Sequence, residues 1–110
     1  MFVLREVWEF PVRFTVTPPA GEEQTLELIC RTGPAIGRAI AQASEADDPP
    51  AALENALLHA VVDWRDVVDP HGEPVPFDRE LFRQLLREVW FAVPFLEAYR
   101  RERDRVRGKA

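Results

Sequence analysis

The chain has 110 residues, of which 46% are hydrophobic and 30% are charged. This length and composition predict one globular domain over residues 1–110, and the single cysteine, Cys30, excludes an intrachain disulfide and a zinc site built from several cysteines. No apolar run approaches the ~18 residues of a membrane span, and the N-terminus lacks the basic region and cleavable apolar stretch of a signal peptide. We therefore expect a protein that is neither secreted nor transmembrane.

The net charge of −5 is unevenly distributed along the chain. Residues 1–99 carry eight Arg against 17 Asp and Glu, whereas residues 100–110 carry five Arg and one Lys against two acids. Contacts with phosphates need a basic face, so the acidic body argues against a nucleic-acid partner. The basic end is typical of a last helical turn that complements the helix dipole, and we expect residues 100–110 to fray.

The first third of the chain, residues 1–32, predicts an antiparallel β-hairpin. Two segments alternate apolar and polar side chains with the period of a half-buried strand: Val12, Phe14 and Val16, then Leu26, Leu28 and Cys30. The stretch 18–23 between them is rich in turn-forming residues. Residues 2–8 could add a third, edge strand, with Pro11 interrupting its pairing.

Residues 33–107 predict a body of about four helices. Helix starts are indicated by Gly33-Pro34 and by the N-cap residues Asp48 and Asp78. Two apolar stripes at helical spacing follow the two caps: Leu53, Ala56, Leu57, Ala60, Val61 and Trp64, then Leu81, Phe82, Leu85, Leu86, Val89 and Trp90. Pro94 should break or kink the chain, and a last helix should carry Phe95, Leu96 and Tyr99. Because a small hairpin cannot stand alone in water, we expect an α+β fold in which it packs on the helices.

The segment between the second and third helices, residues 65–77, is rich in proline and has a distinct pattern. Asp69-Pro-His-Gly72 is a turn sequence, and the two prolines at positions 74 and 76 should hold the chain extended. Phe77 precedes the N-cap Asp78 and should pack on Phe82 as a hydrophobic staple. This loop should therefore be stiff.

A helix ending in Trp, followed by Asp-x-x-Gly-x-Pro-x-Pro-Phe and a helix cap, resembles the tail assembly chaperones of long-tailed bacteriophages and prophages. The residues that carry the resemblance are Trp64, Val67, Asp69, Gly72, Pro74, Pro76 and Phe77. The resemblance implies a non-catalytic protein of the host bacterial cytoplasm that binds the tape measure protein and helps recruit tail tube subunits. A homo-oligomer is also compatible with it.

Six residues are candidates for binding a partner. The resemblance points to Trp64, Val67, Pro74 and Phe77, and the helical pattern adds Phe91 and Phe95. Phe91 lies off the main stripe and should be more exposed than its neighbour Trp90. For Trp64, a packed core position is favoured over a partner contact, because it closes the second apolar stripe.

The sequence predicts no catalytic, cofactor or metal site, and hence no enzyme. The acids and histidine of the loop region do not match the spacing of a calcium loop: Asp63, Asp66, Asp69 and His71. Cys30 should be buried and inert, and His59 should lie at the surface or at the boundary of the core. A metal enzyme that uses these acids therefore ranks last among the alternatives.

Two other functions stay open from the sequence. One is another phage morphogenesis or structural protein, such as a tail-completion or head–tail connector component. The other is a small nucleic-acid-binding regulator that uses the Arg-rich segment Arg100–Lys109, which would bind DNA or RNA in a salt-sensitive way.

Overall fold

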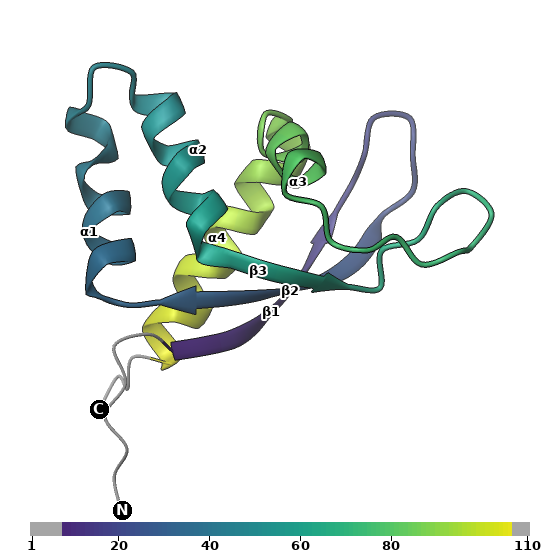
Figure 1. Cartoon of the computed structure of the whole chain (residues 1–110). Helices are drawn as coiled ribbons and strands as arrows, with labels where there is room; N and C mark the ends of the chain where they lie inside the picture. The colour runs from purple at the N-terminus through teal and green to yellow at the C-terminus, as the bar shows by residue number, and fades with distance from the viewer. Residues whose placement is uncertain (1–7, 107–110) are drawn as a thin grey trace, which may run out of the picture.

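The computed structural model describes residues 8–106 of the chain. The elements follow in the order β1 (Trp8–Val16), β2 (Gln24–Thr32), α1 (Pro34–Gln42), a short 3-10 turn η1 (Ala43–Glu45), α2 (Pro49–Ala60), β3 (Val61–Arg65), α3 (Arg79–Leu86) and α4 (Val89–Val106). The structure combines a three-stranded antiparallel sheet in the order β1-β2-β3 with four helices; α4 lies along β1, and α1 packs on α2, as Figure 1 shows. The expected α+β fold is confirmed.

The β1–β2 hairpin forms as the alternation predicts, with Val12 opposite Leu28 and Phe14 opposite Leu26. One face of the sheet is buried under the helices, and α4 lies along β1; the other face carries mainly polar and charged side chains, together with Pro11 and Ile29. Pro11 pairs with Ile29 inside β1 rather than interrupting it, because an edge strand can spare the missing N–H. The strand proposed for residues 2–8 falls on residues outside the described range, except for Trp8, where β1 begins.

The third strand of the sheet lies where the sequence predicts the end of a helix. Helix α2 ends at Ala60, and Val61–Arg65 form β3, paired with β2. Cys30 pairs with Val61 and Leu28 with Trp64, so β3 has one extra residue, a β-bulge. The bulge turns both Val61 and Trp64 toward the core, although they are three residues apart. This spacing imitates a helical stripe, which explains the wrong prediction.

The boundary between the last two helices also differs from the prediction. The chain turns at Arg87–Glu88, and Pro94 lies inside α4. Phe82 and Phe91 are nine residues apart, so one continuous helix would place them about 180° apart. The turn instead brings their rings together, with centroids 6.2 Å apart. Pro94 costs α4 one backbone hydrogen bond, but the helix continues because its core face spans the proline.

The helix starts agree with the caps that the sequence indicates. Pro34 opens α1, the Asp48 carboxylate accepts a hydrogen bond from the Ala51 N–H (3.3 Å), and Asp78 accepts two from the first turn of α3. Helix α4 continues to Val106 and so includes part of the basic segment 100–110, whose fraying stays a prediction. No helix among residues 8–106 is long and apolar enough to cross a bilayer.

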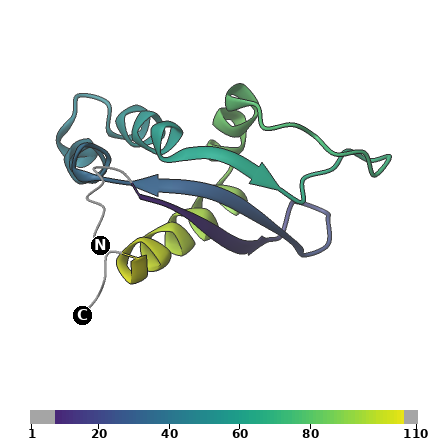
Figure 2. The ribbon, with the colours of Figure 1, turned by 60° about the horizontal axis from the view of Figure 1, so that its bottom comes forward.

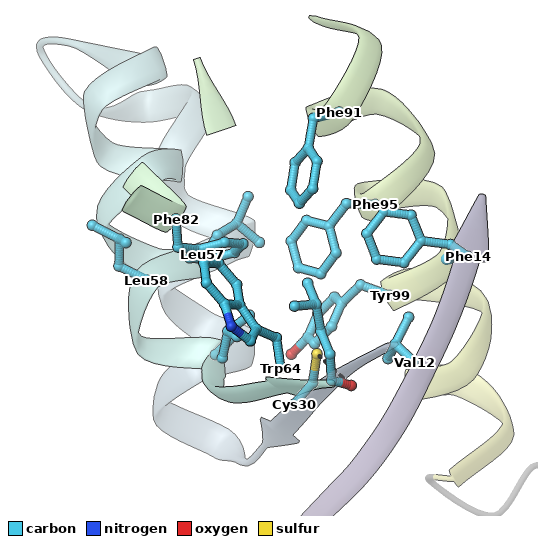
Figure 3. Close-up of a cluster of buried hydrophobic side chains, with 14 of the residues drawn as sticks. Val12, Phe14, Cys30, Leu57, Leu58, Trp64, Phe82, Phe91, Phe95 and Tyr99 are labelled. Atoms are coloured by element: carbon cyan, nitrogen blue, oxygen red, sulfur yellow. Dashed lines mark hydrogen bonds between the residues drawn. The ribbon is translucent and has the colours of Figure 1, made fainter. Parts of the chain in front are cut away.

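The core is rich in aromatic rings and lies between the sheet, α2, α3 and α4 (Figure 3). Phe95 is fully buried and contacts the rings of Phe14, Phe82 and Tyr99, with centroids 5.6 to 6.0 Å apart. The Tyr99 hydroxyl donates to the Arg31 carbonyl oxygen (3.0 Å), which satisfies the one polar atom of this ring. These contacts fix α4 on the sheet.

Candidate functional site

The loop between β3 and α3, residues 66–77, folds as a small hairpin. The Asp69 carbonyl accepts from the Gly72 N–H (2.9 Å), and the Asp69 carboxylate accepts from the N–H groups of His71 (2.8 Å) and Glu73 (3.0 Å). Gly72 has a φ of +81°, a conformation that favours glycine. The turn predicted from the sequence is confirmed, and the stiffness of the loop stays a prediction.

Trp64 ties this loop to the body of the molecule. Its indole N–H donates to the Val75 carbonyl (2.7 Å), and its ring meets Phe77 edge to face, with centroids 5.1 Å apart. Phe77 in turn contacts Phe82, with centroids 6.0 Å apart, which confirms the predicted staple. The loop is therefore positioned by side chains that also belong to the core.

An apolar groove of about 580 Å³ opens beside the loop. Its walls come from the β1–β2 connection, the loop, α3 and the start of α4, and its lining residues are Pro19, Trp64, Val67, Val75, Leu81, Gln84, Leu85, Glu88 and Trp90. In both Figure 1 and Figure 2 the loop and the β1–β2 connection extend at the same end of the molecule, away from α1 and α2. Two stretches that are distant in the sequence, residues 17–23 and 64–90, thus border one surface.

The groove keeps apolar side chains accessible to solvent. Leu81 is 42% exposed, although it belongs to the apolar stripe that predicted a core position. Trp90 is half-buried, and its indole N–H donates to the Glu88 carboxylate (3.2 Å) across the α3–α4 turn. Exposed aromatic and aliphatic groups beside a polar rim are typical of protein-binding surfaces.

The six predicted partner-binding residues divide into two groups. Val67 and Phe77 are half-buried and Pro74 is exposed, whereas Trp64, Phe91 and Phe95 are buried. Contacts within the chain are enough to explain why the last three side chains are buried. Trp64 and Val67 line the groove. The expectation that Phe91 is more exposed than Trp90 is wrong, because Phe91 is 2% exposed and packs against Phe14 and Phe82.

Seven groove residues were not among the predicted binding residues: Pro19, Val75, Leu81, Gln84, Leu85, Glu88 and Trp90. Sequence periodicity places Leu81, Leu85 and Trp90 on one core stripe, and it cannot show that α3 ends at Leu86. Because the chain turns after Leu86, Trp90 is only half-buried and lines the groove. The proline pair in the β1–β2 connection was the only sequence signal near Pro19.

The groove is bordered by negative charge. The β1–β2 connection, residues 17–23, and the loop together carry five carboxylates and no Lys or Arg. Asp66 pairs with Arg13 (3.4 Å). Glu22, Glu23 and Glu73 are exposed and, among residues 8–106, have no ion-pair partner.

The arginines of α3 do not offset this charge, because they are held on another side of the helix. Arg83 and Arg87 bind the Glu54 carboxylate of α2 at 3.2 and 2.8 Å, and Arg79 donates to the Leu58 carbonyl. The hydrogen bond from Arg87 lowers the pKa of Glu54 below its ordinary value. Helix α3 thus presents cations to α2 and apolar side chains to the groove.

The residues considered for chemistry do not assemble into a site. Asp69 serves the loop turn, and Asp63 accepts from the Trp64 backbone N–H (2.8 Å). In the range 8–106, no three His, Cys, Asp or Glu side chains come close enough to hold a metal ion. Burial raises the pKa of the Cys30 thiol, and His59 and His71 are exposed, as expected.

No protein-family model matches this sequence, and comparisons with curated proteins and with solved structures found no significant match.

Proposed function

We propose that this chain is a non-catalytic phage tail assembly chaperone, which binds the tape measure protein and helps recruit tail tube subunits. The observation that carries the proposal is that the loop with the family resemblance forms one wall of an accessible apolar groove. A chaperone for a long helical client needs such a surface, because an amphipathic helix is bound through its apolar face.

The construction of the loop supports a binding role. Trp64, Phe77 and the turn at Asp69 hold the loop in one shape before any partner arrives. A surface ordered in advance loses less conformational entropy on binding. The loop that carries the family resemblance is therefore built so that it positions the groove wall.

Co-expression tests the proposal. The chain is produced together with the tape measure protein encoded in the same gene cluster, and we expect the latter to become soluble and to co-purify. The variant Leu81→Glu places a charge in the groove and should abolish co-purification. Val93→Glu is the matched control, because Val93 has similar exposure (48%) and does not line the groove.

The result that would overturn the proposal is a tape measure protein that stays insoluble beside a well-folded chain. Mass spectrometry of purified particles separates a chaperone from a structural component, such as a tail-completion or connector protein. A chaperone should be missing from the particles, whereas a structural component should be present.

A further inference from the structure

We propose that the groove recognises a basic amphipathic helix, whose apolar face packs on Leu81 and whose flanking Lys or Arg side chains meet the acidic border. This inference rests on the proposed function and specifies the chemistry of the client segment. It follows from the lining of the groove, the charges carried by the segments around it and the backbone pairing within the loop wall.

The apolar part of the groove can take a row of helix side chains. Val67 and Val75 form one wall, and Leu81 and Leu85, four residues apart on one side of α3, form the other. The Val75 N–H already donates to the Val67 carbonyl (2.9 Å). The loop wall thus offers side chains rather than unpaired backbone, which favours a helix over an added strand.

The negative charge around the groove determines which charge a partner should carry. Glu22 and Glu23 belong to the β1–β2 connection, which contributes Pro19 to the groove, Glu73 belongs to the loop, and Glu88 lines the groove itself. Their carboxylates have no cation from residues 8–106 to offset them. An incoming Lys or Arg would gain attraction here, whereas an acidic segment would be repelled.

A second copy of the chain fits this surface less well. Two grooves placed face to face would bring their acidic borders together. The cations near the end of α4 are already used in part, since Arg103 pairs with Asp104 (3.1 Å) and Arg105 with Glu102 (2.8 Å). We therefore assign the groove to a separate, basic partner.

The test uses the full chain and two synthetic helical peptides with the same apolar residues. One peptide carries Lys and Arg at the flanking positions, and the other carries Glu there. Titration is followed by the NMR signals of the indole N–H groups, because Trp64 and Trp90 line the groove and Trp8 does not. We expect the basic peptide alone to bind, to shift the signals of Trp64 and Trp90, and to lose about tenfold in affinity between 50 and 300 mM NaCl.

Two charge-reversal variants separate local from overall charge. Glu22→Lys with Glu73→Lys changes the border, and Glu45→Lys with Glu97→Lys makes the same change in net charge at exposed residues that do not line the groove. We expect about tenfold weaker binding from the first pair and less than about twofold from the second. Equal losses would show that net charge alone attracts the peptide and would overturn the inference.

The remaining outcomes are also decisive. If the acidic peptide binds as tightly as the basic peptide, the proposed selection by charge is wrong. If the Leu81→Glu variant binds the basic peptide with unchanged affinity, the peptide does not bind in the groove. Dimerisation of the chain alone that Leu81→Glu abolishes would assign the groove to a second copy. The peptide test and the co-expression test can fail separately: a chain that solubilises the tape measure protein but ignores the basic peptide keeps the proposed function and loses this inference.

Discussion

Phe82 has aromatic neighbours on two sides, and the two sides differ in what covers them. Toward α4 it meets Phe91 and Phe95, which are buried. Toward the loop it meets Phe77, which is half-buried and meets Trp64 edge to face beside the groove. The ring contacts have similar distances on both sides. On the α4 side the sheet covers the rings, so this side is part of the core. On the loop side no comparable element of residues 8–106 covers them, so this side is part of the surface.

The largest effect should come from opening the closed side. Phe95→Ala removes a fully buried ring that contacts Phe14, Phe82 and Tyr99, and it should lower the free energy of unfolding by about 3–5 kcal/mol. Urea denaturation measures the loss. Leu81→Ala, on the open side, should stay within about 0.5 kcal/mol. Similar losses in the two variants would contradict the contrast between core and surface.

An intermediate effect is expected where the two sides join. Trp64→Phe keeps a ring in place but removes the indole N–H that donates to the Val75 carbonyl, and it should cost about 1–3 kcal/mol. Amide exchange in the loop should also accelerate, because Trp64 holds the loop to the body. Trp8→Phe is the control, since Trp8 is exposed at the start of β1. Unchanged exchange in the loop would show that Trp64 does not position it.

A smaller effect tests the shape of the loop itself. Gly72→Ala should destabilise the protein by about 1 kcal/mol, because φ is +81° there and the added methyl meets no neighbour within 4 Å. The cost is therefore conformational. Gly37→Ala has the same open surroundings in helix α1 and should stabilise by about 0.5–1 kcal/mol. Thermal unfolding measures both variants: Gly72→Ala should lower the melting temperature, and Gly37→Ala should raise it.

Features encoded by neighbouring residues were predictable from the sequence. The caps at Asp48 and Asp78, the turn at Gly72 and the staple of Phe77 on Phe82 depend on a few adjacent residues with strong preferences. The β1–β2 hairpin is equally local. These features give the fold class and the turn of the loop.

Features that depend on distant residues were not predictable. Pairing with β2 decides that Val61–Arg65 are a strand, and a bulge gives Trp64 a spacing that fits a helix equally well. Contact between Phe82 and Phe91 decides where α3 ends. The groove depends on both outcomes, because it needs Trp90 turned out of the core and Pro19 brought beside the loop. In the sequence, the exposed residues of the groove therefore have the spacing of core residues.

The smallest predicted effect concerns the side of α3 that faces away from the groove. Arg87 and Arg83 lower the pKa of Glu54, whose side chain is 14% exposed, relative to the unfolded chain. The pair therefore stabilises the fold above the unfolded pKa of about 4.3, and this contribution is lost as pH falls through the folded pKa. Glu54→Gln should be less stable than the parent at pH 6, and the difference should shrink toward pH 3.

Urea unfolding at several pH values measures this difference, with Glu45→Gln as the exposed control. The same variant also tests whether the two sides of α3 act independently. Glu54 contacts Arg83 and Arg87, none of which lines the groove, so Glu54→Gln should leave binding of the basic peptide unchanged at neutral pH. Weaker binding would mean that the salt bridges to α2 set the position of Leu81, and that the groove depends on α2 as well as on the loop.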